Sequence, residues 1–225
     1  LDALEHPEQI DVAQLAYALH LERSAARAGD CRLALVASSG TDLKAKLELG
    51  LKALQGRESE VKYPQGVFFR EGPATDGGVC FVFPGQGSQR VNMLADLTTS
   101  LPELHGLFER ADVLLADRLE QPLSRYIYPV PVFSDEERAR QQAALNATQV
   151  AQPALGVIDS AALRVLGDYG LKPDFVAGHS YGEYVALHAA GVIGLDDFIR
   201  LSEVRGRLAG EAGRRHPGAL AAIDA

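Results

Sequence analysis

The sequence has few cysteines, no net positive charge and no long apolar run, and each absence narrows its possible functions. Only Cys31 and Cys80 occur, far apart and without the paired spacings of zinc sites or disulfide frameworks, so we expect reduced thiols and no metal site. The formal net charge of -8 and the pI near 5.3 argue against nucleic acid or an anionic membrane as a partner. No stretch approaches the length of a membrane-spanning helix, and the acidic N-terminus is unlike a signal peptide. We therefore expect a cytoplasmic protein.

The apolar content of 47% is enough for a buried core, and the first part of the chain predicts a small mixed unit. Residues 11–21 carry apolar side chains at helical spacing, and RLALVA at 32–37 suits a buried strand. Residues 38–54 predict a helix that Ser and Thr residues cap and that Gly56 ends. The apolar stripe of this helix is formed by Leu43, Leu47, Leu51 and Leu54. A further strand is expected at VFF, residues 67–69.

A loop at 72–78 separates this unit from a segment of different texture, which predicts a second domain. VCFVF at 79–83 is a continuous apolar run of the kind found in buried parallel strands, and the loop PGQGSQ ends it. The charged run at 134–146 predicts a solvated helix, and 153–166 a helix that starts at its proline. A strand at 175–177 follows. This order favours an α/β fold with a parallel sheet.

The turn after that strand has the pattern G-x-S-x-G, in Gly178-His179-Ser180-Tyr181-Gly182. An apolar strand precedes it and an apolar helix follows, which is the context in which this pattern exposes a serine nucleophile. Ser180 is therefore the predicted nucleophile, and the Tyr181 N–H, at a helix N-terminus, can stabilise an oxyanion. The alternative is that Ser180 is only a small turn residue.

A serine nucleophile needs a base, and the histidines of this part of the chain are the candidates. His179 is adjacent to Ser180 in an extended turn and points elsewhere, so we expect it to pack or to stabilise the turn. His188 lies eight residues along the following helix, about 12 Å away at the helical rise, which is too far. His216 lies in a loop flanked by Gly and Pro and stays open as a base.

Four motifs follow one another along the chain: FVFPGQGSQ, NATQVAQPAL, GHSYGEYVALHAAGV and LSEVRGRL. Together they resemble the acyltransferase domains of fatty acid and polyketide synthases, of the malonyl-CoA:acyl-carrier-protein transacylase type. The resemblance implies an α/β-hydrolase-like parallel-sheet core, incomplete in this chain, at 76–217 and the start of a ferredoxin-like small subdomain at 218–225. Residues 1–75 resemble the small α/β linker domain between the ketosynthase and the acyltransferase of a type I polyketide synthase.

By this resemblance, Ser180 takes a malonyl-type acyl group from CoA and passes it to the phosphopantetheine thiol of an acyl carrier protein. The Gln86 N–H completes the oxyanion hole with that of Tyr181. One alternative interpretation of the PGQGSQ loop is a flexible turn without a catalytic role. A phosphate-binding loop is a less well supported interpretation, because no G-K-[ST] follows. Gln152 and His179 complete the predicted substrate-binding set, although a Gln before a proline is also an ordinary cap or loop residue.

Arg205 is the predicted ligand of the malonyl carboxylate. On a helix over 196–211, Leu201, Val204 and Leu208 form an apolar stripe beside it, so a cation points along the buried side. The resemblance matches Arg205 to the family arginine that holds the free carboxylate, a task that suits a planar fork of donors. The alternative is a structural ion pair with Glu203 or Glu183.

The sequence departs from the family pattern at its end, because the motif with the catalytic histidine is not reached. We therefore expect the isolated chain to be inactive without that downstream residue. The Tyr of GHSYGE and the NATQVAQPA segment look more like iterative synthases of the enediyne or polyunsaturated type. No bound cofactor is expected; the partners are an acyl carrier protein, a CoA thioester and the ketosynthase of the same synthase.

Two further functions stay open. A serine hydrolase or thioesterase would share the nucleophile and the oxyanion hole but would not need a carboxylate-binding arginine. A non-catalytic scaffold fragment would use residues 1–75 chiefly for docking.

Overall fold

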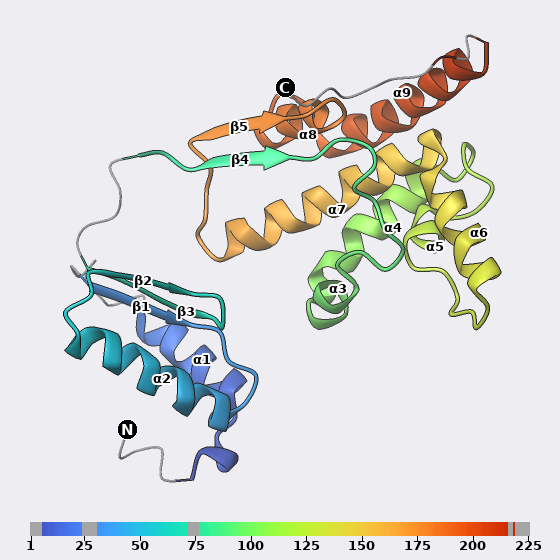
Figure 1. Ribbon diagram of the computed structural model, residues 1–225. Helices are drawn as coiled ribbons and strands as arrows, with labels where there is room; N and C mark the ends of the chain where they lie inside the picture. The colour runs from blue at the N-terminus through green and yellow to red at the C-terminus, as the bar shows by residue number, and fades with distance from the viewer. Residues whose placement is uncertain (1–5, 24–30, 72–76, 216–217, 219–225) are drawn as a thin grey trace. The chain divides into compact units, whose positions relative to one another are not determined.

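The computed structural model describes residues 6–23, 31–71, 77–215 and 218 of the protein (Figure 1). The chain divides between Asp76 and Gly77 into two compact units. Both units combine helices with strands, so the expected α/β class is confirmed. Most of the loop expected at 72–78, His216 and the expected start of a small subdomain beyond 218 lie outside the described residues.

The N-terminal unit is a three-stranded antiparallel sheet with helices. Its strands lie in the order β1-β3-β2, so the last strand of the unit is central. The helix predicted near the N-terminus and the strands predicted from the apolar runs are all present. The elements are η2 (Pro7–Gln9), α1 (Val12–Arg23), β1 (Cys31–Leu35), α2 (Gly40–Gln55), β2 (Glu60–Tyr63) and β3 (Val67–Glu71).

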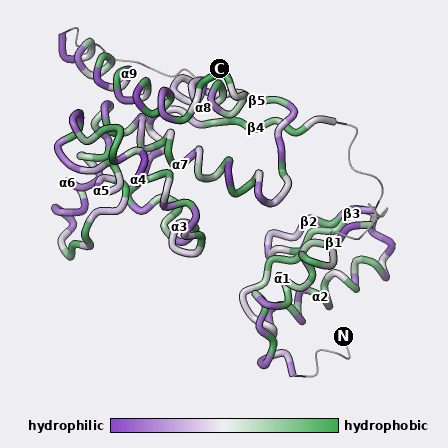
Figure 2. Tube along the Cα trace, turned by 180° about the vertical axis from the view of Figure 1, so that it is seen from behind, coloured by the Kyte–Doolittle hydropathy of each residue, from purple (hydrophilic) through white to green (hydrophobic). Residues whose placement is uncertain are grey.

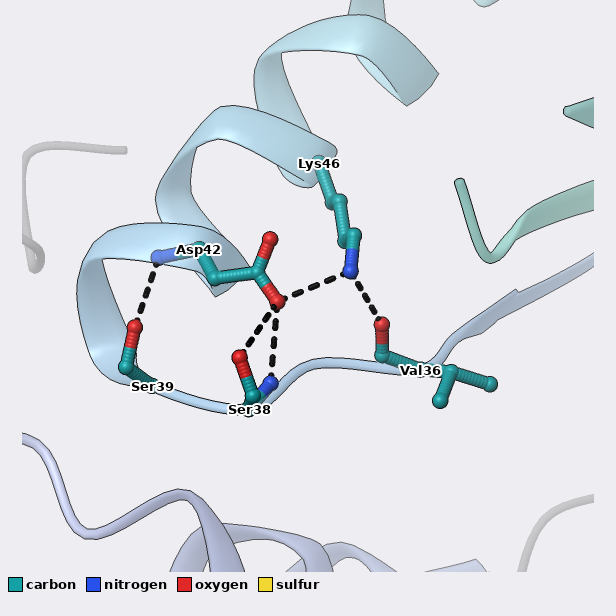
Figure 3. Close-up of polar contacts among 5 residues, drawn as sticks. All are labelled: Val36, Ser38, Ser39, Asp42 and Lys46. Atoms are coloured by element: carbon teal, nitrogen blue, oxygen red, sulfur yellow. Dashed lines mark hydrogen bonds and ion pairs between the residues drawn. The ribbon is translucent and has the colours of Figure 1, made fainter. Parts of the chain in front are cut away.

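The N-terminus of α2 is capped as the SSGT sequence predicts (Figure 3). The Ser39 hydroxyl accepts a hydrogen bond from the Asp42 N–H at 3.1 Å. The Asp42 carboxylate in turn accepts from the Lys46 ammonium at 2.8 Å and from the Ser38 N–H at 2.9 Å. The hydrogen bond from Lys46 is the largest cause of a lowered pKa of the Asp42 carboxyl, and the bond from the Ser38 N–H lowers it further. Lys46 also donates to the Val36 carbonyl at 2.6 Å, which joins the helix to the end of β1.

The buried face of α2 differs from the predicted leucine stripe. Leu51 and Leu54 are 41% and 43% exposed, whereas Gly50 and Ala53 are buried. A Cβ at Gly50 would lie 3.3 Å from a methyl of Leu33 on β1. The helix therefore turns its small residues toward the sheet, and Leu51 and Leu54 of the predicted apolar stripe lie on its exposed side.

The C-terminal unit has the predicted order of strand, helices, strand and helix. The predicted solvated helix at 134–146 is α6, and Figure 2 shows mainly hydrophilic residues along it. The elements are β4 (Cys80–Phe83), α3 (Ala95–Ser100), η3 (Pro102–Leu104), α4 (His105–Leu114), α5 (Leu123–Ile127), α6 (Asp135–Asn146), α7 (Thr148–Asp168), β5 (Phe175–Gly178), α8 (Gly182–Ala189) and α9 (Leu195–Arg215).

Strands β4 and β5 lie side by side and parallel, with Phe83 opposite Gly178 (Figure 1). The pairing extends one step further, since the His179 N–H donates to the Phe83 carbonyl at 3.1 Å. Parallel neighbours end at the same edge of a sheet. The PGQGSQ loop and the GHSYG turn therefore leave the sheet next to each other.

The strands are less buried than their apolar sequences predict. Val82 is 72% exposed and Phe175 is 65% exposed, although their neighbours in β4 and β5 are more deeply buried. In the first unit Leu33 of β1 is 42% exposed. Side chains alternate between the two faces of a strand. In the described sheets, one face is more deeply buried than the other.

Helix α7 is the centre of the second unit and starts earlier than predicted. It begins at Thr148, so Pro153 lies inside it and not at its first position. Every residue from Val150 to Ile158 is buried, and α7 packs along α9. This burial stabilises the helical path even though Pro153 cannot donate the bond to the Gln149 carbonyl.

Candidate active site

Ser180 lies at the turn between β5 and α8 with a backbone φ of 55°, in the left-handed region. A Cβ at Gly178 would lie 2.1 Å from the Gly182 carbonyl carbon, and one at Gly182 would lie 2.2 Å from the Phe83 carbonyl oxygen. Only glycine fits at either position, because real Cβ atoms do not come so close. The turn holds the exposed Ser180 in a strained conformation of the kind found at functional sites.

Gln86 and Tyr181 provide backbone N–H groups on the two adjoining turns. Neither N–H donates a hydrogen bond to any part of the chain that the structure describes. The turns are in contact, since a Cβ at Gly85 would lie 2.8 Å from the His179 carbonyl oxygen and 3.5 Å from the Ser180 Cβ. The arrangement leaves two free donors near the serine, as an oxyanion hole requires.

The side chain of Gln86 is bound to the start of α7. Gln152 donates to the Gln86 side-chain oxygen at 3.1 Å, and Gln86 donates to the Thr148 hydroxyl at 3.3 Å. Gln152 is 1% exposed, and its own side-chain oxygen has no partner among the described residues. The structure therefore brings Gln86 and Gln152 together, and it adds Thr148, which was not predicted as a site residue.

A second set of side-chain amides fixes the far end of the same loop. The buried Gln89 accepts from the Gly87 N–H at 2.7 Å and donates to Asn146 at 2.9 Å. Gln142 also donates to Asn146, at 2.9 Å. Sequence reasoning missed these residues, although Gln89 and Asn146 belong to two of the quoted motifs. They hold the loop in place through hydrogen bonds between side chains and to the Gly87 backbone.

Arg205 lies beside aromatic rings and not beside an acid. Its guanidinium carbon is 5.0 Å from the ring centre of Tyr184 and 6.0 Å from that of Tyr181. Glu203 pairs with Arg118 at 3.0 Å and with Arg207 at 3.2 Å. Within the described parts of the chain Arg205 forms no ion pair, so the alternative of a structural pair with Glu203 or Glu183 is wrong for these residues.

The buried face of α9 also differs from the predicted stripe. Leu201 and Leu208 are 37% and 52% exposed. The buried residues are Phe198, Ile199, Ser202, Glu203 and Gly206. Polar Ser202 and Glu203 can be buried because each has a hydrogen-bonding partner distant in sequence, Tyr181 and Arg118, which an apolar stripe cannot reveal. Arg205 itself is half-buried at the rim of this face.

The histidines near Ser180 have structural positions. The His179 Nδ1 would lie 2.9 Å from a Cβ at Gly85, so its ring packs on the neighbouring loop. His188 is 2.9 Å from the Ile193 carbonyl oxygen through Nδ1, and its ring stacks on Phe198 at 4.8 Å. No histidine in the described ranges has an interaction with Ser180.

Metal ligands and membrane-spanning helices are the remaining features that could indicate a function. There is no cluster of three or more His, Cys, Asp or Glu side chains that could hold a metal ion in the described part of the chain. None of its described helices combines the length and the apolar character that crossing a membrane demands.

Residues 80–225 match the family described as "Acyl transferase domain". The chain is 35% identical over 214 residues to the spectinabilin polyketide synthase system protein NorB of Streptomyces orinoci, which covers 92% of this chain and 9% of that protein. It is 42% identical over 144 residues to the malonyl CoA-acyl carrier protein transacylase of Escherichia coli O157:H7, covering 64% of this chain and 42% of that protein.

Among solved structures, the acyl transferase domain of ZmaA is similar with a TM-score of 0.72 and 25% identity, over 93% of this chain and 44% of that chain. The chain thus spans less than half the length of each of these relatives. The family match covers well over half of the sequence and includes the serine turn, the PGQGSQ loop and Arg205. The chain therefore belongs to the acyltransferase domain family.

Proposed function

We propose that this chain carries the serine nucleophile of a malonyl transferase in polyketide biosynthesis. The protein takes a malonyl-type group from CoA and passes it to the phosphopantetheine thiol of an acyl carrier protein. The observation that carries the proposal is the position of Ser180, exposed on a strained turn beside two backbone N–H groups that have no acceptor among the described residues. The similarity to a malonyl CoA-acyl carrier protein transacylase supports the choice of donor and acceptor.

The reaction proceeds in two acyl transfers. In the first, the Ser180 oxygen attacks the thioester carbonyl, and the Gln86 and Tyr181 N–H groups stabilise the oxyanion of the tetrahedral intermediate. The C–S bond breaks and the thiol of CoA leaves with a proton. In the second, the carrier thiol attacks the serine ester, and Ser180 regains its hydroxyl proton.

Arg205 sets the preference for an acyl group that carries a carboxylate. Its guanidinium has free donors and no acid partner among the described residues, so it can bind a carboxylate in bidentate fashion. Gln152, whose buried side-chain oxygen has no partner in the described ranges, and His179 line the substrate region in this proposal.

The assignment of the chain's parts is also proposed. Residues 1–75 form a small linker domain that follows a ketosynthase, 76–217 form a hydrolase-like acyltransferase subdomain with an incomplete sheet, and 218–225 begin a small subdomain. The general base that activates Ser180 is a histidine of the natural protein other than His179 and His188. The synthase is of the iterative type and works in the cytoplasm.

The choice of acceptor separates a transferase from a hydrolase or thioesterase. The intact natural protein, acylated with labelled malonyl-CoA, is divided between buffer alone and buffer with a pantetheine thiol. A transferase passes the label to the thiol much faster than to water. Equal loss of label in both samples would favour the hydrolase, and failure to acylate would favour the scaffold.

A further inference from the structure

We propose that Tyr184 is a positioning residue for Arg205, and that its ring face holds the guanidinium so that the N–H donors stay free for the carboxylate of the acyl group. This inference rests on the proposed function of Arg205. It adds to that function a residue that determines the preference between carboxylated and neutral acyl groups.

The first observation is the geometry of the rings. Tyr181 and Tyr184 are one helical turn apart at the start of α8, and their rings are nearly parallel, with an interplanar angle of 8° and centres 6.4 Å apart. The Arg205 guanidinium carbon lies 5.0 Å from the Tyr184 centre, within the range of a cation–π contact, and 6.0 Å from that of Tyr181. Tyr184 is therefore the nearer of the two aromatic contacts.

The second observation is that the ring behind Tyr184 is fixed. Tyr181 is fully buried, and its phenol oxygen is 2.7 Å from the Ser202 hydroxyl on α9. A Cβ at Gly156 on α7 would lie 2.4 Å from the same phenol oxygen, so only glycine leaves room for it. The stack of Tyr184 on Tyr181 is thus anchored to both neighbouring helices.

The third observation is the contrast between Arg205 and two other arginines, Arg118 and Arg207. Arg118 and Arg207 use their N–H groups to bind Glu203. Arg205 forms no such bond with any residue that the structure describes. A cation–π contact uses the face of the guanidinium and leaves its edge, where the donors are, available to a carboxylate. The aromatic contact therefore orders Arg205 without occupying the donors that the substrate needs.

The test compares two changes of Tyr184 in the intact natural protein. Acylation of the protein is followed by mass spectrometry at varied malonyl-CoA and, separately, acetyl-CoA, whose acyl group has no carboxylate. Tyr184→Leu removes the aromatic face and is expected to raise the KM for malonyl-CoA roughly three- to tenfold, with little change in the maximal rate. The KM for acetyl-CoA should stay the same. Tyr184→Phe keeps the face and should behave as the natural protein.

Four results would overturn the inference. A Tyr184→Leu protein with unchanged KM for malonyl-CoA would show that the ring does not position Arg205, and equal losses with both thioesters would indicate a general structural role. If Tyr184→Phe raised the KM for malonyl-CoA as much as Tyr184→Leu does, the effect would belong to the phenol hydroxyl and not to the ring face. An Arg205→Ala protein separates these three results from a failure of the proposed function. If Arg205→Ala does not reduce the preference for malonyl over acetyl groups, Arg205 is not the carboxylate ligand, and both proposals fail.

Discussion

The phenol of Tyr181 donates a hydrogen bond to the hydroxyl of Ser202 across the buried boundary between α8 and α9, at 2.7 Å. The direction follows from the second bond of Ser202, whose own O–H donates to the Phe198 carbonyl at 2.7 Å. A hydroxyl has one hydrogen, so Ser202 can only accept from Tyr181. Burial raises the pKa of the Tyr181 phenol, which keeps it protonated as a donor. This bond connects the proposed oxyanion residue to the helix that carries Arg205.

The direction of this bond predicts an asymmetry between two substitutions. Ser202→Ala leaves the buried Tyr181 phenol without its acceptor and should lower the free energy of unfolding by about 1–3 kcal/mol. Tyr181→Phe removes the donor, while Ser202 keeps its bond to the Phe198 carbonyl, so it should cost less. Urea unfolding of both proteins measures the two values, and a larger loss for Tyr181→Phe would contradict the assigned direction.

The ion pairs of Glu203 on α9 are predicted to make a large contribution to the stability of the protein. Its side chain is 2% exposed and binds Arg118 at 3.0 Å and Arg207 at 3.2 Å. Glu203→Gln removes the charge that both partners need and should destabilise the protein by about 2 kcal/mol. Glu211→Gln is the matched control, because Glu211 pairs with Arg207 near the surface, and its loss should be about 0.5 kcal/mol or less. Equal shifts in thermal unfolding would argue against a special role of Glu203.

The buried carboxyl of Asp159 should make the stability of the protein depend on pH. Burial raises the pKa of its carboxyl to about 7, and one carboxyl oxygen has no partner among the described residues. Between about pH 4 and pH 7 the folded state keeps a proton that the unfolded state has released, so stability falls as the pH rises through this range. Above pH 7 the folded protein must hold a buried charge.

Asp159→Asn should therefore stabilise the protein at pH 8 by about 1–3 kcal/mol and have little effect near pH 4. Asp117→Asn, at an exposed position, is the control and should show no such trend. The measurement is urea unfolding across this pH range. A gain for Asp159→Asn that is equal at both ends of the range would disprove the assigned burial effect.

Much of this fold could be predicted from local sequence patterns, because turns, helix caps and strands depend on residues that are close together in the sequence. The G-x-S-x-G turn, the Ser39 cap and the parallel strands follow from spacing, capping and apolar runs. The parts that were wrong depend on contacts distant in sequence. Nothing in the spacing of α9 indicates that Glu203 is buried or that it binds Arg118, 85 residues away. The same reason explains why the helix start before Pro153 was missed.

The candidate site divides in the same way. The tight turn that carries Ser180 and Tyr181 could be predicted because the glycines of G-x-S-x-G have a backbone reason, whereas Gln86 was assigned from the family resemblance. The catalytic roles of all three residues stay predictions. The polar contacts that fix the PGQGSQ loop, through Thr148 and Asn146, join segments more than 50 residues apart. Their partners could be identified only when the helices were placed.

The central claim is that Ser180 becomes acylated by malonyl-CoA, and intact-mass spectrometry tests it most directly. The intact natural protein is mixed with malonyl-CoA, in parallel with a Ser180→Ala protein and with Ser100→Ala as a control at an exposed serine. We predict one malonyl adduct on the natural protein and on the Ser100→Ala protein, mapped to Ser180 by peptide analysis, and none on Ser180→Ala. An adduct that persists in Ser180→Ala, or its absence from the natural protein, would contradict the account.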